Sequence, residues 1–182
     1  MKRAVLLALA FAVTGAAQQY TKDGEFILPK DFRSWVFLSS GLGMTYTNGA
    51  NPHPTFDNVF VNPGALKEFQ KTGRWPDKTV LIKENRASAS HPSNKEGSFQ
   101  ADVVSAEAHV KDSSRGGWAF YIFRKDAQTG KTLPVSAGCV ACHEKNGATD
   151  TTFVQFYPTL IEAAKKAGNY KDSGDVVMPG KE

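Results

Sequence analysis

Apolar and polar residues alternate with a period of two through the middle of the chain, a pattern that predicts β-strands. The predicted strands cover residues 56–61, 79–86, 99–110 and 117–124. In the third strand the alternation changes phase between Val103 and Val104, which predicts a β-bulge. The last two strands are expected to pair as a hairpin. We therefore predict a mainly β (α+β) domain, in which an antiparallel β-sheet carries short helices.

Apolar residues at helical spacing predict the short helices. These helices are expected over residues 31–38, 63–71 and 150–166. Asp31 is a suitable N-cap for the first helix, and Gly73 follows the end of the second. Pro158 is expected to kink the third helix. The stretches between these elements are predicted to be an extended entry segment, a loop and a polar turn, at residues 18–29, 41–54 and 88–97.

The first 17 residues have the three parts of a secretory signal peptide. Lys2 and Arg3 supply the positive start, and residues 4–13 form an apolar run too short to span a bilayer. Small residues before Gln18 suit signal peptidase, so we predict cleavage after Ala17. The prediction is a signal peptide over 1–17, one domain over 18–182 and a periplasmic location. A retained membrane anchor is the alternative.

The composition is that of an ordinary globular protein, with 41% apolar and 22% charged residues. The formal charge of +4 includes Lys2 and Arg3. Without them, 20 basic side chains face 18 acidic ones, which leaves +2. We therefore expect no nucleic-acid partner, and no membrane partner after processing.

The strongest chemical signal is the sequence Cys-x-x-Cys-His, formed by Cys139, Cys142 and His143. This is the attachment signature of c-type haem. One helical turn brings the two thiols close enough to bond to the two vinyl groups of the porphyrin, and His143 then binds the iron as its proximal ligand. The sequence therefore predicts one covalently attached haem c, bound by a C-terminal segment.

Two other interpretations of the cysteines need features of their own. A thioredoxin-like redox pair would need a reactive cysteine at a helix N-terminus in a βαβ setting, which this chain does not offer. A zinc site would need further Cys or His residues at ligand spacing, and His53, His91 and His109 are scattered singly.

The sixth iron position is predicted to be open or occupied by water. An electron-transfer cytochrome would place a Met thioether there. After cleavage only Met44 and Met178 remain, the first in a Gly-rich loop and the second in a polar C-terminal stretch. Neither stretch is apolar enough to hold a ligand firmly. A Met-ligated electron carrier remains as the alternative.

Three groups of motifs resemble the cytochrome P-460 family, which includes the cytochromes c-prime-beta. They lie at residues 59–63 with 71–73, at 110–112 with 117–120, and at 153–158. The resemblance extends from about residue 26 to residue 165. It implies a β-rich fold, a homodimer and a five-coordinate haem with one His ligand. One branch of the family oxidises hydroxylamine and carries a lysine cross-linked to a haem meso carbon. The c-prime-beta branch lacks this bond and binds nitric oxide or carbon monoxide under an aromatic cap.

The resemblance makes Lys83 the candidate for the cross-link, because residues 79–84 match the family's Thr-Val-x-Val-Lys-Glu run. In a strand, Lys83 shares a face with Leu81 and Thr79. A lysine on a partly apolar face loses solvation, which lowers its pKa and makes the amine a better nucleophile. The alternative is a lysine that reaches from the sheet edge to water.

The sequence does not single out one acid as proton relay on the distal side of the haem. The family's hydroxylamine oxidisers use a carboxylate from the loop before the haem cysteines, but residues 131–138 contain no acid. A proton relay would then fall to Asp57, Asp102, Glu107 or solvent.

Three phenylalanines bear on the gas-binding alternative. An apolar ceiling above the haem formed by Phe37, Phe56 and Phe60 would favour gas binding, and the competing interpretation, which we prefer, is ordinary core.

Three functions therefore stay open. The first is a periplasmic oxidoreductase that removes electrons from hydroxylamine at ferric haem and passes them to a soluble acceptor cytochrome. The second is a protein that binds nitric oxide or carbon monoxide without turnover. The third is the Met-ligated electron carrier. The bond at Lys83 separates the first from the second, and the iron coordination separates the third from both.

Overall fold

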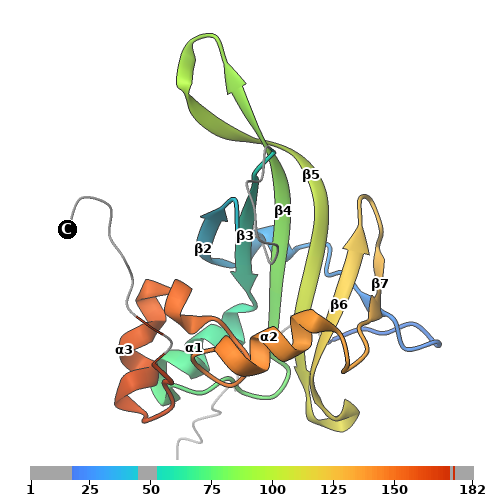
Figure 1. Ribbon diagram of the computed structural model, residues 1–182. Helices are drawn as coiled ribbons and strands as arrows, with labels where there is room; N and C mark the ends of the chain where they lie inside the picture. The colour runs from blue at the N-terminus through green and yellow to red at the C-terminus, as the bar shows by residue number, and fades with distance from the viewer. Residues whose placement is uncertain (1–17, 45–52, 173, 175–182) are drawn as a thin grey trace, which may run out of the picture.

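A computed structural model describes residues 18–44, 53–172 and 174. The described residues form a seven-stranded sheet in the order β1-β7-β6-β5-β4-β3-β2, with neighbouring strands antiparallel (Figure 1). The strands are β1 Phe26–Ile27, β2 Val36–Leu42, β3 Thr55–Val61, β4 Val80–His91, β5 Asn94–Asp112, β6 Gly117–Arg124 and β7 Thr129–Thr132. The helices are α1 Pro63–Thr72, α2 Gly138–Asn146 and α3 Pro158–Lys166, with single 3-10 turns η1 Phe32–Ser34, η2 Ser113–Arg115 and η3 Val154–Phe156. The predicted mainly β class is confirmed.

The predicted bulge in β5 is confirmed by the strand register. Asn85 of β4 pairs with Ser105, and the next residue, Arg86, pairs with Val103. Val104 is therefore left out of the pairing, and its side chain is half exposed. The apolar phase slip marked this position because a bulge moves the rest of a strand by one residue relative to its two faces.

The helix predicted over 31–38 is wrong. Only η1 is helical there, and Asp31 makes no side-chain cap hydrogen bond. From Val36 the chain instead pairs with β3 as the edge strand β2. β-branched and aromatic side chains such as Val36 and Phe37 suit a strand, and pairing with β3 satisfies their backbone groups. The predicted loop over 41–54 begins later than expected, at Gly43, and residues 45–52 lie outside the described part of the chain.

The polar turn predicted over 88–97 is also wrong. β4 continues to His91 and β5 begins at Asn94, so only two residues separate the strands. Most side chains in this hairpin are polar on both faces and therefore give no apolar alternation, although the backbones still pair. The hairpin extends well beyond the other strands as an arm (Figure 1).

Pro158 begins a helix instead of kinking one. The stretch predicted as one helix divides into η3 and α3, and Pro158 is the first residue of α3. Proline suits the first turn of a helix because the amide hydrogen that it lacks would have no partner there.

The two faces of the sheet carry separate cores. On the helix-side face, Val61 and Leu81 pack with Phe69 of α1 and Leu160 of α3. On the opposite face, strand residues such as Ile82 pack with Phe26 and Phe32 of the N-terminal segment. All three α-helices gather at one end of the sheet in Figure 1. Because β4 alternates between these two cores, its helix-side residues lie in one row.

Candidate functional site

Helix α2 carries the Cys-x-x-Cys-His sequence and lies across one end of the sheet (Figure 1). Cys139 and Cys142 are free thiols, and both are partly buried. The α2 backbone ends where the Gly147 amide donates to the His143 carbonyl at 2.9 Å. The helix therefore places two unbonded thiols about one turn apart, with the histidine directly after the second.

His143 is held with one ring nitrogen committed to the protein. Its Nδ1 lies 2.8 Å from the carbonyl oxygen of Thr151. Because a carbonyl only accepts hydrogen bonds, Nδ1 must carry the proton, which leaves the lone pair on Nε2 to bind a metal. Burial lowers the pKa of His143, so the neutral imidazole is favoured. Neutral imidazole is the form that ligates iron.

Aromatic rings surround the His143 imidazole. Phe153 lies 4.3 Å away and Phe120 lies 4.7 Å away, centroid to centroid, and both rings are inclined to it. The ring of His109 meets it edge-on at 5.3 Å. These contacts restrict rotation of the imidazole, so the direction of Nε2 is set by packing as well as by the hydrogen bond to Thr151.

A polar cluster lies on the same helix-side face. Lys83 of β4 pairs directly with Glu107 of β5, and the amine is 3.1 Å from Oε1 of the carboxylate. The next pair along the strands on this face joins Leu81 to His109, and His109 contacts His143. The predicted strand phase, with Lys83 and Leu81 on one face, is confirmed. The cluster and the His143 surroundings are therefore adjacent.

Asp57 is a buried acid beside this pair. On β3 it lies opposite Asn85, two positions along from the Val59–Lys83 pair and on the same face, and accepts a hydrogen bond from Thr55 at 3.2 Å. Burial raises the pKa of Asp57, the positive charge of Lys83 opposes the rise, and Glu107 adds to it. Of the three acids proposed for a proton relay, Asp57 and Glu107 interact electrostatically here. Asp102 is exposed on β5 beyond the bulge.

The aromatic ceiling formed by Phe37, Phe56 and Phe60 is contradicted. Phe60 pairs with Ile82, so it lies on the face opposite Lys83. It makes edge-to-face contacts with Phe32 and Phe37 at 5.7 Å each, as part of the opposite-face core. Phe56 alternates with Asp57 onto that same face.

Of the two methionines named as alternative iron ligands, only Met44 lies in the described part of the chain. Met44 is half exposed, and its sulfur lies where a side chain on Gly41 would be. Met44 is therefore not held in a packed pocket. Met178 lies outside the described residues, as does the predicted signal peptide.

His109 was missed by the sequence reasoning. It is buried, its ring stacks on Phe120 at 3.9 Å, and its Nε2 lies 3.0 Å from the Thr151 hydroxyl. Burial lowers the pKa of His109 well below its usual range, so this side chain is neutral. The available signal was its place opposite Phe120 in the predicted hairpin, two residues after Glu107.

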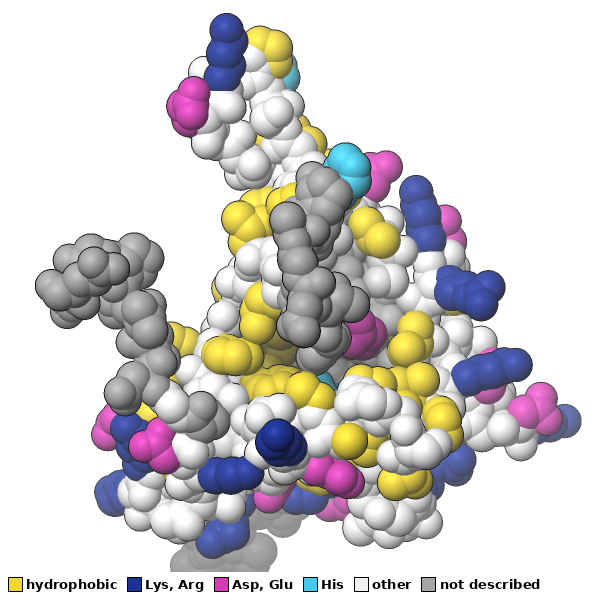
Figure 2. Space-filling model, viewed as in Figure 1, with side chains coloured by type: hydrophobic (Ala, Val, Ile, Leu, Met, Phe, Trp, Pro, Cys, Tyr) yellow, Lys and Arg dark blue, Asp and Glu magenta, His cyan; other side chains and the backbone are white. Residues whose placement is uncertain are grey.

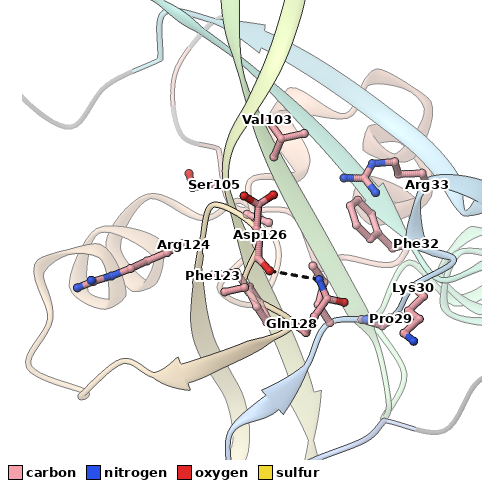
Figure 3. A pocket seen from close by; sticks show the side chains of 13 residues that line it. Pro29, Lys30, Phe32, Arg33, Val103, Ser105, Phe123, Arg124, Asp126 and Gln128 are labelled. Atoms are coloured by element: carbon pink, nitrogen blue, oxygen red, sulfur yellow. Dashed lines mark hydrogen bonds between the residues drawn. The ribbon is translucent and has the colours of Figure 1, made fainter.

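A pocket of about 290 Å³ opens on the opposite face of the sheet (Figure 3). Its apolar wall includes Phe32 and Phe123 of the opposite-face core, and Arg33 and Gln128 line its rim. None of the Cys-x-x-Cys-His residues and neither member of the Lys83–Glu107 pair lines it. This pocket is therefore separate from the candidate site.

The residues present fit a haem. Two thiols and an imidazole with a directed Nε2 are the donors that a c-type haem requires. On the helix-side face, hydrophobic side chains gather between α2 and the sheet (Figure 2). Ile122, opposite Glu107 on β6, is half exposed there, which is the apolar surface that a porphyrin would cover.

Two further statements hold for the described residues. No group of three or more His, Cys, Asp or Glu side chains could hold a metal ion. No helix in the described ranges is long and apolar enough to cross a membrane.

Comparison with known proteins gives one match. The family model described as Cytochrome P460 matches residues 29–154. The matched range is more than half of the chain and contains Lys83, both cysteines and His143. No curated protein matches the chain.

Proposed function

Because the chain belongs to the cytochrome P460 family, whose members bind haem, we propose that it is a periplasmic mono-haem c-type cytochrome that oxidises hydroxylamine. The proposed haem attachment is through Cys139 and Cys142, with His143 as the iron ligand. Haem, when bound, supplies an iron that takes up a small nitrogen compound and accepts its electrons. The residues around it must hold that compound and handle its protons.

The observation that carries the proposal is the pair formed by Lys83 and Glu107, with buried Asp57 on the same face of the sheet. That face also carries His109, which contacts His143. Oxidising hydroxylamine releases protons along with electrons, and a base must lie within hydrogen-bond reach to take them. Asp57 has a raised pKa, which brings a carboxyl closer to the range where it both accepts and returns protons. We assign proton transfer to Glu107 and Asp57.

We further propose that Lys83 forms a third covalent bond, to a meso carbon at the haem edge. Only a deprotonated amine can act as the nucleophile, and Glu107 is within reach to accept its proton at 3.1 Å. The new N–C bond replaces one N–H and one C–H bond. Its formation therefore releases two protons and gives two electrons to an oxidant such as a peroxide.

Gas binding without turnover is the second candidate. An apolar ceiling would have favoured it, but Phe37, Phe56 and Phe60 lie on the opposite face of the sheet. The side chains that share a face with the His143 surroundings include a lysine and two acids. This polarity favours a substrate that must lose protons over a neutral gas.

The remaining parts of the proposal rest on the sequence. Residues 1–17 would direct export to the periplasm, and a soluble cytochrome would accept the electrons. We also propose a homodimer, on the family resemblance of the sequence alone. The low net charge of the processed chain supports neither a nucleic-acid nor a membrane partner.

Lys83→Arg tests the proposal because arginine keeps the charge beside Glu107 but is a far weaker nucleophile. In wild type, a haem peptide should retain the Lys83 peptide after proteolysis and should weigh two hydrogen atoms less than the sum of its parts. The variant should keep haem through the cysteines, lose hydroxylamine oxidation and still bind nitric oxide. The matched control is Lys78→Arg, a lysine paired with Asp112 away from the site. Wild type with only two thioether bonds and no turnover would place the protein with the gas binders.

A further inference from the structure

Thr151 joins two histidines through two different groups. Its carbonyl accepts the Nδ1 hydrogen of His143 at 2.8 Å, and its hydroxyl lies 3.0 Å from Nε2 of His109. His109 and Thr151 are 42 residues apart in sequence. The contact between them therefore ties the loop after α2 to the centre of the sheet.

His109 is the fixed end of this link. It lies on β5, which is paired on both sides, with Leu81 of β4 and Phe120 of β6 as its direct neighbours. Its ring stacks on Phe120 at 3.9 Å and 16° and contacts Trp118 at 4.3 Å. Only 8% of the residue is exposed. A ring held in this way has little freedom to follow a moving loop.

Thr151, at the other end of the link, lies in a tight loop. The loop is closed by the bridge between Thr149 and Thr152, and Asp150 has a positive φ of 53°. Trp75 anchors it through a hydrogen bond to Thr152 at 2.9 Å. That anchor fixes the neighbouring residue, whereas the Thr151 side chain itself is hydrogen-bonded to His109.

We propose that His109 is a positioning residue for the proximal ligand. By holding the Thr151 hydroxyl, it keeps the Thr151 carbonyl on Nδ1 of His143, which sets the plane of the imidazole and increases its basicity. Partners that hydrogen-bond to the second nitrogen of a ligating histidine orient the ring and tune the metal in this way. His109 acts as a neutral group and undergoes no change of charge. The inference rests on the proposed role of His143 as iron ligand.

Thr151→Val and His109→Phe test the link from its two ends. Each removes the hydrogen bond while keeping side-chain shape or ring packing. Weakening the bond to Nδ1 makes the imidazole a poorer electron donor, so the reduction potential should rise and the iron–histidine stretching frequency in the resonance Raman spectrum should fall. We expect the reduction equilibrium to shift about tenfold, the low end for losing an outer-shell partner, which is about 59 mV for one electron.

The controls separate tuning from general damage. The double variant should shift no further than either single one, because both remove the same link. Thr151→Ser keeps the hydroxyl and should restore the wild-type values, and His109→Gln should restore them in part. Unchanged potential and stretching frequency in both single variants, with haem still attached, would overturn the inference. Wild type without covalent haem would instead overturn the proposed function, and the mass of the protein distinguishes the two failures.

Discussion

Glu107 interacts with three other polar side chains of the candidate site. It faces Lys83 at 3.1 Å, accepts a longer hydrogen bond from Asn85 at 3.3 Å and influences the charge on Asp57. Of the two carboxylates it is also the more exposed, with 39% of its side chain accessible. Glu107 is therefore the member of the proposed relay that can exchange protons with solvent.

Replacing Glu107 should lower the rate of hydroxylamine oxidation without lowering haem content. Glu107→Gln keeps the shape but cannot take up a proton at neutral pH, so we expect hydroxylamine oxidation to fall about 100-fold, the low end for losing a general base. Haem content should stay at the wild-type level. Steady-state kinetics and a haemochrome spectrum measure these two results. Glu144, an exposed acid on α2, provides the matched control, and Glu144→Gln should change neither turnover nor haem content. Unaltered turnover in Glu107→Gln would assign the relay to Asp57 or to solvent.

Asp112 is an acid that should make the stability of the fold depend on pH. Burial opposes its ionisation, but hydrogen bonds from Lys78, Ser114 and Tyr20 outweigh this effect and lower the pKa of Asp112 to about 2. A carboxyl whose folded pKa is lowered stabilises the protein above its unfolded pKa of about 4. That stability is lost as the pH falls through the folded value.

Asp112→Asn should therefore reduce the free energy of unfolding at pH 7 by about 2 kcal/mol, which lies in the range for hydrogen bonds to a charged group. The difference from wild type should shrink between about pH 4 and pH 2, where the wild-type carboxylate is protonated. Urea titrations at several pH values measure it. Asp23→Asn, an exposed acid, should leave the pH profile unchanged. A constant difference down to pH 2 would contradict the assignment.

At the residue scale, the spacing of Cys139, Cys142 and His143 was enough to propose them as haem ligands, which stays a prediction. The strand face of Lys83 was predicted from alternation and is confirmed. His109 could not be identified, because its contact with Thr151 depends on a loop that folds back across 42 residues. Asp57 could be named as one of several acids. Selecting it required the register between β3 and β4.

At the scale of elements, the junction of α1 with α3 depends on one glycine. Gly73 ends α1 with a positive φ of 64°, a conformation that side chains disfavour. A Cβ on this residue would lie 2.4 Å from the Ala163 carbonyl oxygen and equally close to Cβ of Ala167. α1 can therefore approach α3 at this point only because the side chain is missing.

Two glycine substitutions in and beside the same helix should have opposite effects. Gly73→Ala should destabilise the protein by about 2 kcal/mol or more, because strain adds to the clash. Gly64→Ala lies within α1 and meets no atom within 4 Å, so it should stabilise the protein by about 0.5–1 kcal/mol through helix propensity. Thermal unfolding of both variants tests this pair. Equal effects would show that the α1–α3 contact does not limit the substitution.

Element boundaries followed from the sequence where apolar alternation was strong. The strands over 56–61 and 117–124 match β3 and β6 to within one residue, and the bulge at Val104 lies where the phase changes. The outer half of the β4–β5 arm was missed because its strands have polar residues on both faces. β2 was taken for a helix because a short apolar run fits both periods, and its pairing with β3 decided the outcome.

At the scale of the whole molecule, the sheet separates the face that carries the candidate site from the face that the N-terminal segment covers. Helices and the Cys-x-x-Cys-His segment lie on one side, and the N-terminal segment covers the other with Phe26 and Phe32. None of the residues in the opposite-face core belongs to α2. If the proposed haem is lost, we therefore expect this core to keep the sheet assembled.

Export and haem attachment would change the mass of the whole molecule, and both changes are predicted. Protein purified from the periplasm should begin at Gln18 and carry one haem through two thioether bonds, as measured by intact mass and a pyridine haemochrome spectrum. Cys139→Ala or Cys142→Ala should severely reduce haem retention while the β-sheet signal in circular dichroism remains. A spectrum of free haem b, or an unprocessed N-terminus, would contradict the prediction.

The position of β1 has a consequence for how the chain folds. β1 pairs with β7, so Phe26 finds its partner at Gly130 only after most of the chain has been made. Contacts between such distant segments form slowly. Until then the cover of the opposite-face core is absent, and a chain emerging from the ribosome stays open. The β1–β7 pairing cannot form before the segment after residue 124 has been synthesised. Delayed closure of this kind would suit the export proposed above, in which the chain crosses a membrane unfolded.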